Sequence, residues 1–178
     1  MNPKDKKQVL ISFHYRPVEL YKDNQSFLSS DYLHGVNEFL NSDELKKLSK
    51  DVNIVFIPHA RYKKYVGWFD VPKYISVKDT EQFQDVFVQS DFLITDFSST
   101  SFEFAYMDKP TFVYVPDLDC VKQNMPHYHI ENIQDYPHLA WCDTISDVVS
   151  GIKSYCGRNT KRFMVSDKMF DHHDTNNT

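Results

Sequence analysis

Two serine hydroxyls stand in a short polar turn, Asp96-Phe97-Ser98-Ser99, between an apolar run and an amphipathic stretch. If a helix begins directly after this turn, its first N–H groups have no partners inside the helix and carry partial positive charge. The hydroxyls of Ser98 and Ser99 would add donors, and such a group of donors binds phosphate. Residues 96–107 contain no glycine, so the turn is neither a P-loop nor a dinucleotide-binding loop. The alternative is that Asp96, Ser98 and Ser99 only cap the helix.

An imidazole and a guanidinium follow another apolar run, residues 53–58, in the step His59-Ala60-Arg61. A histidine at a strand end binds a phosphate oxygen when it is protonated, or accepts a proton when it is neutral. An arginine two residues further on can clamp a pyrophosphate. His59 and Arg61 are therefore the candidate catalytic residues, although a lone histidine is more often structural. Arg16 also follows an apolar run and either forks onto phosphate or is a solvated surface arginine.

The elements that must position these residues alternate between strands and helices. Apolar and β-branched runs predict strands at residues 8–15, 53–58, 74–77, 92–95 and 111–115. Helical spacing predicts helices at residues 31–50, 81–89, 100–107 and 145–155, with expected caps at Asp43, Asp79 and Thr144. We expect loops at residues 18–30 and 63–72. This order predicts an α/β fold with a doubly wound, Rossmann-like parallel sheet.

All strands of a parallel sheet end at one edge, and open α/β sheets bind ligands there. We therefore expect Ser98 and His59 to open on one crevice that accepts the linked phosphates of a nucleotide. The 178 residues suit a single domain, and the net charge of −5 argues against a general nucleic-acid-binding surface.

Other classes of protein are disfavoured by composition. No run approaches the roughly 18 apolar residues of a membrane span. The three cysteines are far apart and indicate free thiols in a reducing compartment. The spacing of His127, His129 and His138 fits no common metal motif, so we predict no metal site.

The stretch TDFSSTSFEFAYMDKP resembles the signature of the CDP-glycerol glycerophosphotransferase family. The matching residues are Thr95, Asp96, Phe97, Ser98, Ser99, Phe102, Glu103, Phe104, Lys109 and Pro110, and Glu103 stands where the family usually has Asp. The step Pro58-His59-Ala60-Arg61 is similar to the family's His-Pro-Arg step, with Ala60 in place of proline. Arg16 stands at the family's aromatic-Arg step, and Asp174 resembles its closing acidic residue, although Thr175 replaces the glycine.

The resemblance implies a GT-B-type transferase, of which residues 1–178 would be the carboxyl-terminal, donor-binding half. Such an enzyme moves glycerol phosphate, or a related polyol phosphate, from a CDP carrier to a hydroxyl of a lipid-linked, cell-wall or capsular polymer. The expected donor-binding residues are Arg16, Thr95, Asp96, Ser98, Ser99, Glu103 and Asp174. His59 and Arg61 would neutralise the diphosphate, and His59 could donate a proton. Neither a metal nor a cofactor is required by such a site.

The resemblance also implies partners and a location. The acceptor would be held by a missing amino-terminal half, and the full-length protein would work in the cytoplasm at the inner face of the cell membrane. Two alternatives remain. The chain could be the donor half of a nucleotide-sugar glycosyltransferase in capsule or lipopolysaccharide synthesis, or a non-catalytic binding domain.

Overall fold

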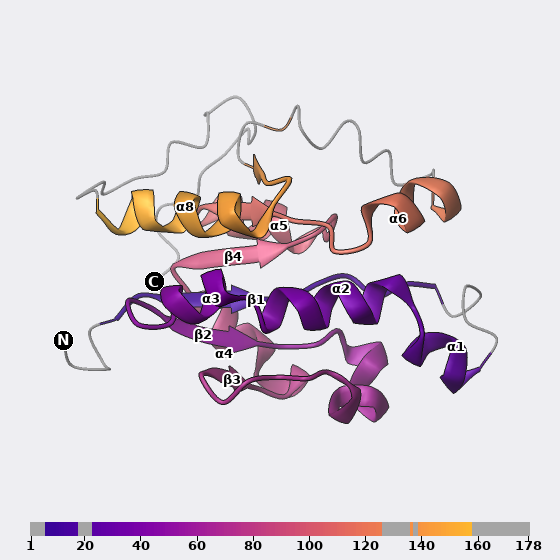
Figure 1. The fold of residues 1–178 in the computed structure, drawn as a ribbon. Helices are drawn as coiled ribbons and strands as arrows, with labels where there is room; N and C mark the ends of the chain where they lie inside the picture. The colour runs from indigo at the N-terminus through magenta and orange to yellow at the C-terminus, as the bar shows by residue number, and fades with distance from the viewer. Residues whose placement is uncertain (1–5, 18–22, 126–135, 137–138, 158–178) are drawn as a thin grey trace.

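A six-stranded, entirely parallel sheet forms the centre of the computed structural model, which describes residues 6–17, 23–125, 136 and 139–157 (Figure 1). The strands are β1 Gln8–Ile11, β2 Asn53–Phe56, β3 Ile75–Val77, β4 Phe92–Thr95, β5 Thr111–Val113 and β6 Leu139–Trp141. Their spatial order is β3-β2-β1-β4-β5-β6, with β1 and β4 adjacent. This is the order of a doubly wound Rossmann sheet, so the predicted fold class is confirmed.

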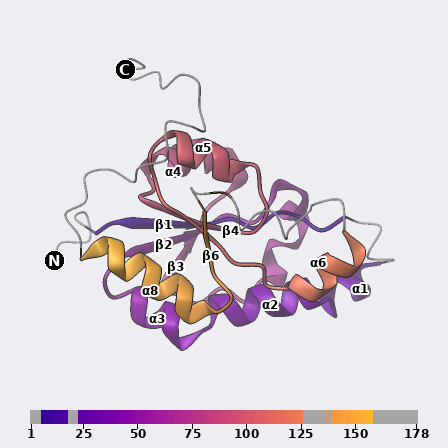
Figure 2. The same ribbon diagram turned by 90° about the horizontal axis from the view of Figure 1, so that it is seen from above.

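Helices cover both faces of the sheet (Figures 1 and 2). One face carries α2 Asp31–Leu40, α3 Asp43–Leu48 and α8 Ile145–Cys156, and the other carries α4 Phe83–Gln89 and α5 Thr100–Tyr106. Both faces are apolar because a central parallel strand is buried on both sides. Val9, Ile11 and Ile94 pack toward the first group of helices, and Leu10 and Leu93 toward the second.

Two short helices, α1 Asn24–Leu28 and α6 Leu118–Asn124, lie at the end of the molecule toward which the strands point (Figure 1). The sequence predicted a loop over residues 18–30, and this is wrong for α1, where Phe27 is buried against the rings of Tyr62 and Trp68. The loop predicted at residues 63–72 is wrong for residues 63–68, which belong to the 3-10 helix η3 Ala60–Trp68, and correct for residues 69–72.

Serine, threonine and aspartate side chains set the starts of several helices. The predicted helix at residues 31–50 is two helices, and Ser42 rather than Asp43 caps the second by accepting from the N–H of Leu45. Asp79 caps the short 3-10 helix η4 Thr80–Gln82 that leads into α4. Thr144 caps α8 in a reciprocal capping box with Asp147. The predicted caps at Asp79 and Thr144 are therefore confirmed.

A close backbone approach fixes α2 against the loop after β5. A Cβ atom added to Gly35 would lie 2.4 Å from the carbonyl oxygen of Pro116. Only glycine fits at this contact without a shift of one of the two backbones. Gly35 therefore holds α2 beside the segment that leads from β5 into α6.

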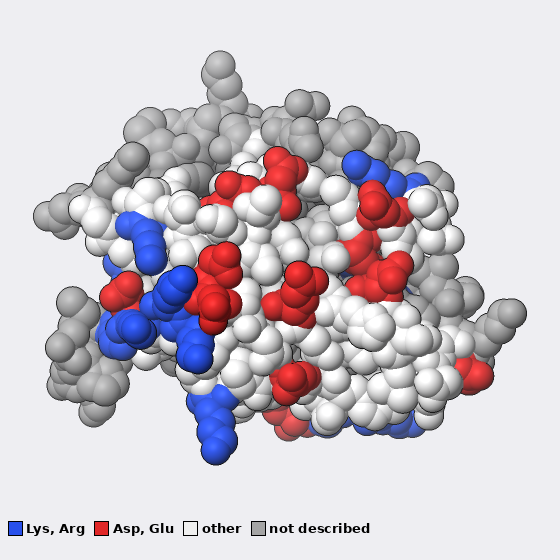
Figure 3. Space-filling model, in the orientation of Figure 1, with Lys and Arg blue, Asp and Glu red and all other residues white. Residues whose placement is uncertain are grey.

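Charged side chains of both signs are visible on the surface of the protein (Figure 3). On the face shown in Figure 3, Asp and Glu side chains spread over the middle and the right, whereas the largest group of Lys and Arg lies at the left, near α3. Among the described residues, no helix combines the length and hydropathy needed to cross a membrane.

Candidate nucleotide-binding site

The candidate site lies at the carboxyl edge of the sheet, where β1 and β4 are neighbours. The chain leaves β1 toward the face of α2 and leaves β4 toward the face of α5 (Figure 2). This divergence is the switch point at which open α/β sheets bind ligands. The two strand ends are tied together, because Thr95 Oγ1 donates to the carbonyl of Ser12 (2.7 Å) and the N–H of His14 donates to Asp96 Oδ1 (2.8 Å).

A cavity of about 390 Å³ opens at this edge. It is lined by the ends of β1, β2 and β4 and by the starts of η4, α4 and α5. The lining residues are Ser12, Phe13, His14, Ile57, Pro58, His59, Ala60, Thr80, Phe83, Ser98, Ser99 and Thr100. The structure thus brings Ser98, Ser99 and His59 together, as the sequence predicted. The lining, as far as the chain is described, holds imidazoles and hydroxyls but no carboxylate, so it suits an anion.

His59 caps η3 and keeps its imidazole on the cavity. Its Nδ1 accepts a hydrogen bond from the backbone N–H of Arg61 (3.2 Å), so Nε2 carries the proton of the neutral ring. Burial lowers the pKa of His59, and the nearby His14 and Arg61 lower it further. At neutral pH His59 is therefore a hydrogen-bond donor through Nε2–H, with no charge of its own.

The two serines at the start of α5 differ, because Ser98 Oγ accepts from the backbone N–H of Thr100 (3.4 Å) whereas Ser99 caps nothing. Ser99 occupies the N-cap position, but its exposed side chain makes no capping hydrogen bond. Ser98 Oγ accepts from Thr100 Oγ1 (2.9 Å), and the carboxylate of Asp96 bonds to His14 and Arg16 instead. The capping alternative therefore fails for Asp96 and Ser99, and a cluster of hydroxyls remains at the cavity.

Arg61 lies beside the cavity lining, on an aromatic platform. Its exposed guanidinium sits over the Tyr15 ring, 4.3 Å from the centroid, and Tyr15 in turn packs against His59 with 4.9 Å between ring centroids. The stacking holds the positive charge near the imidazole without an acidic partner for Arg61 among the described ion pairs.

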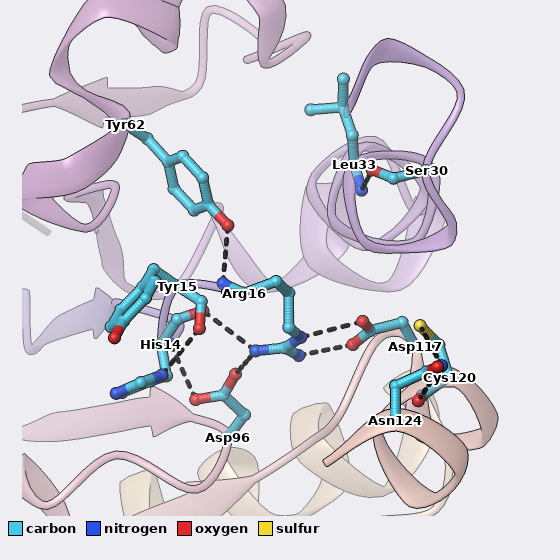
Figure 4. Close-up of polar contacts among 10 residues, drawn as sticks. All are labelled: His14, Tyr15, Arg16, Ser30, Leu33, Tyr62, Asp96, Asp117, Cys120 and Asn124. Atoms are coloured by element: carbon cyan, nitrogen blue, oxygen red, sulfur yellow. Dashed lines mark hydrogen bonds and ion pairs between the residues drawn. The ribbon is translucent and has the colours of Figure 1, made fainter. Parts of the chain in front are cut away.

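The structure places Arg16 neither in the cavity lining nor on the surface, contrary to both interpretations of the sequence (Figure 4). It is 1% exposed. Its Nε and Nη2 donate to Asp117, and its Nη1 donates to Asp96 (2.8 Å) and to the carbonyl of His14. The rings of Tyr32 and Phe97 cover the guanidinium. Arg16 therefore ties together the loops after β1, β4 and β5, and its fork is occupied by carboxylates.

The charges of this buried cluster depend on one another. Burial opposes the charge of Arg16, but Asp96 and Asp117 outweigh burial and raise the pKa of Arg16 above its ordinary value. Burial raises the pKa of Asp96, although Arg16 and the bond from His14 oppose this. The cluster thus holds one guanidinium between two carboxylates, one of which, Asp96, belongs to the turn that carries Ser98.

The other three residues predicted to bind the donor are Thr95, Glu103 and Asp174. Thr95 is fully buried and bonds to Ser12, so it frames the turn from within the sheet. Glu103 is exposed and lines a separate groove between α4 and α5, so the structure does not bring it to the cavity. Asp174, like His127, His129 and His138, lies outside the described residues. No cluster of three metal-ligating side chains occurs among the residues that are described.

His14 is a lining residue that sequence reasoning missed. It follows β1 and its ring centroid lies 5.6 Å from that of His59 and 5.4 Å from that of Phe97. Its only signal in the sequence is its place three residues after a buried strand, the same kind of place that singled out His59.

The sequence of this chain is similar to a family model and to several characterised proteins. The sequence model of a family described as CDP-glycerol:poly(glycerophosphate) glycerophosphotransferase matches residues 2–178. The chain is 30% identical over 128 residues to the minor teichoic acid biosynthesis protein GgaB of Bacillus subtilis, covering 70% of this chain and 13% of GgaB. It is 26% identical over 156 residues to a teichoic acid poly(glycerol phosphate) polymerase of Bacillus spizizenii, covering 85% of this chain and 38% of that polymerase.

Solved structures share the fold. The wall teichoic acid polymerase TagF superposes with a TM-score of 0.53 at 20% identity, covering 84% of this chain and 34% of TagF. A UDP-GlcNAc 2-epimerase of Methanocaldococcus jannaschii, in complex with UDP-GlcNAc and UDP, gives a TM-score of 0.51 at 14% identity, covering 87% of this chain and 40% of the epimerase. The chain thus spans well under half the length of each of these proteins.

Proposed function

The chain belongs to the CDP-glycerol:poly(glycerophosphate) glycerophosphotransferase family, and we propose that it supplies the donor site of a GT-B-type enzyme of this family. The reaction is the transfer of glycerol phosphate, or a related polyol phosphate, from a CDP-linked donor to a hydroxyl of a lipid-linked polymer, with release of CMP. The observation that carries the proposal is the cavity at the switch point, which joins Ser98 and Ser99 of one strand end to His59 of another.

The lining can hold a diphosphate through neutral donors. Ser98, Ser99 and Thr100 bring hydroxyls to the lining from the start of α5, and His59 brings an imidazole from the segment after β2, whose neutral form carries its proton on Nε2. Arg61 adds positive charge from its place on Tyr15. In our proposal the acceptor hydroxyl attacks the phosphorus that carries glycerol and loses its proton to solvent, while the bond to CMP breaks and CMP leaves with the electron pair of that bond. These donors stabilise the negative charge on the phosphoryl oxygens. Neither a metal nor a cofactor enters the proposed step.

In this assignment, the present domain binds the donor and the rest of the full-length protein binds the acceptor. The acceptor and its lipid would be held by the part of the relatives that this chain does not span. A soluble nucleotide donor and a lipid-linked acceptor meet at a membrane surface. We therefore place the full-length protein in the cytoplasm, at the inner face of the cell membrane.

Isothermal titration with CDP-glycerol tests the site. We expect binding by the unaltered chain, and a loss of at least about tenfold in affinity when Ser98→Ala and His59→Ala are combined, because hydrogen bonds to charged groups contribute about 1.5–3 kcal/mol each. The matched control combines Ser154→Ala and His34→Ala, two exposed positions on α8 and α2. Absence of binding, or equal affinity of the two double variants, would contradict the proposed site.

A ligand panel separates this function from a nucleotide-sugar transferase, which the shared fold would also serve. A ligand that binds only the native state raises the melting temperature, by an amount that grows with its saturation. We expect CDP and CDP-glycerol to raise it more than UDP or GDP at equal concentration. A larger shift with UDP or GDP would favour a sugar nucleotide as donor.

A further inference from the structure

Arg16 is bonded to two of the segments that line the candidate cavity and belongs to a third, although it does not line the cavity itself (Figure 4). It lies in the loop after β1. Its side chain donates to Asp96, in the turn after β4 that carries Ser98, and its backbone N–H donates to the hydroxyl of Tyr62 (2.7 Å). Tyr62 belongs to η3, which begins next to His59 after the end of β2. Arg16 therefore joins the two strand ends that bring hydrogen-bond donors to the cavity.

On the side of the turn, Arg16 and the backbone of His14 share the carboxylate of Asp96. Nη1 of Arg16 donates to Asp96 Oδ2 (2.8 Å) and to the carbonyl oxygen of His14 (3.0 Å). Asp96 Oδ1 accepts from the N–H of His14 (2.8 Å). Both oxygens of this carboxylate are thus tied to the loop after β1. Ser98 follows Asp96 at the second position, so the place of its hydroxyl depends on these bonds.

On the side of η3, the hydroxyl of Tyr62 makes the link. It accepts from the N–H of Arg16 in the protein interior, and the Tyr62 ring packs against the rings of Phe27 and Phe69, with 5.0 and 6.0 Å between centroids. The backbone N–H of Tyr62 donates to the carbonyl oxygen of His59 (2.7 Å). The hydroxyl of Tyr62 therefore helps to fix the first turn of η3, next to the residue that brings an imidazole to the cavity.

Asp117 holds the guanidinium of Arg16 in one orientation. It accepts from both Nε and Nη2, a two-bond fork that requires the planar guanidinium group. The ring centroids of Tyr32 and Phe97 lie 4.6 and 4.7 Å from the guanidinium carbon. With two nitrogens and the plane of the group fixed in this way, Nη1 is directed at Asp96.

We propose that Arg16 is a positioning residue of the donor site, which holds the Ser98 hydroxyl and the His59 imidazole at the separation that a diphosphate requires. The inference rests on the proposed function, because it assumes that the diphosphate of the donor binds between these two groups. Arg16 does not touch the donor; it acts on Ser98 through Asp96 and on His59 through Tyr62. Groups that bind a ligand must be held within about 0.5 Å of the productive geometry, so loosening either link weakens binding.

The substitution Tyr62→Phe cuts the link to η3 and keeps the buried ring. Its matched control is Tyr74→Phe, because the hydroxyl of Tyr74 also bonds to a backbone group, the carbonyl oxygen of Leu40, at 2.7 Å. Tyr74 directly precedes β3, and therefore lies at the edge of the sheet opposite to the cavity. Both variants lose one bonded hydroxyl, so both should melt at a lower temperature than the unaltered chain.

Isothermal titration with CDP-glycerol, well below both melting temperatures, separates positioning from stability. We expect Tyr62→Phe to bind at least about fivefold more weakly than the unaltered chain, and Tyr74→Phe to bind within about twofold of it. The loss caused by Tyr62→Phe should be smaller when His59 is already replaced by alanine, because the imidazole that Tyr62 positions is then absent. Equal losses in the two backgrounds would contradict a role through His59.

A second variant, Arg16→Lys, tests the link to the turn. Lysine keeps the buried positive charge but has no planar fork, so it cannot bond to Asp117 through two nitrogens and also hold Asp96. We expect it to bind CDP-glycerol at least about fivefold more weakly, with a smaller loss in the Ser98→Ala background. Unchanged affinity in Arg16→Lys would overturn the inference, whatever its effect on the melting temperature.

The outcomes separate the inference from the proposed function. If the unaltered chain does not bind CDP-glycerol, the proposed function fails and the inference fails with it. If the unaltered chain binds, and Tyr62→Phe binds as tightly as Tyr74→Phe, the inference alone is overturned. Backbone amide NMR of the free chain gives a readout that needs no donor. Tyr62→Phe should shift the signals of both His59 and Ser98, and Tyr74→Phe neither, whereas a shift of His59 alone would contradict the link through Arg16.

Discussion

Arg16 keeps a full charge inside the protein, and the turn that carries the candidate site depends on it. The guanidinium bonds to Asp117 through two nitrogens and to Asp96 through a third, and these carboxylates belong to loops on either side of it (Figure 4). Replacing one partner of a buried ion pair leaves the other charge without full compensation, which costs about 3–5 kcal/mol.

The substitution Asp117→Asn tests this role at the residue scale. We expect it to lower the free energy of unfolding by about 3 kcal/mol, because Arg16 keeps its charge but loses half of its compensation. Asp119→Asn is the matched control, since Asp119 lies two residues further on and is exposed. Chemical denaturation of both variants gives the comparison. Equal stability of the two variants would mean that the buried cluster contributes little.

At the scale of elements, the contact between α2 and the loop after β5 sets the position of Asp117. Gly35 lies within α2, where alanine would ordinarily stabilise a helix by about 1 kcal/mol. The added Cβ would instead press on the carbonyl oxygen of Pro116, which belongs to the backbone next to Asp117. The two effects have opposite signs, so the measured sign decides which dominates.

We expect Gly35→Ala to destabilise the protein by about 1–3 kcal/mol, as overpacking of a tight contact does. Gly67→Ala serves as control, because a Cβ atom at Gly67 would meet no atom within 4 Å. That variant should change stability little or raise it slightly. Melting temperatures of the two variants and the unaltered chain suffice. A Gly35→Ala variant as stable as Gly67→Ala would show that α2 and the loop can separate at little cost.

The elements that could be predicted from sequence are those with a strong periodic signal. The central strands are continuous apolar runs because both faces are buried. The helices α2 and α8 have clear apolar stripes, and α8 begins at a cap, Thr144, that the sequence predicted. Strand β6 is only three residues long and half-buried, and α6 begins directly after the segment at Pro116-Asp117. Neither leaves a pattern that exceeds that of an ordinary loop.

The part of the candidate site that could be predicted consists of residues that directly follow a predicted strand. His59, Ser98 and Ser99 follow apolar runs, and parallel pairing then brings their loops to one edge. The role of Arg16 could not be predicted, because its partner Asp117 is 101 residues away and no local pattern links them. Glu103 was misplaced because its position on α5 turns the side chain toward α4 rather than toward the cavity.

At the scale of the whole molecule, the fold is one sheet with one carboxyl edge, and the candidate cavity opens there. TagF shares this fold over 34% of its chain. A donor site alone does not position an acceptor hydroxyl in line with the bond to be broken. Positioning of two reactants is worth about 7–11 kcal/mol of the barrier, which corresponds to effective molarities of about 10⁵–10⁸ M.

We therefore expect this 178-residue chain, by itself, to bind CDP-glycerol and yet release CMP at least about 10⁵-fold more slowly than a full-length relative acting on the same acceptor. The measurement is CMP formation in the presence of a short glycerol-phosphate acceptor, with a full-length teichoic acid polymerase as the positive control. Titration of CDP-glycerol into the same protein sample establishes that the donor site is occupied during the assay. Turnover near that of the full-length relative would contradict the proposed division, since it would mean that this domain also positions the acceptor. Binding without turnover would assign donor binding to this domain and positioning of the acceptor to the remainder of the enzyme.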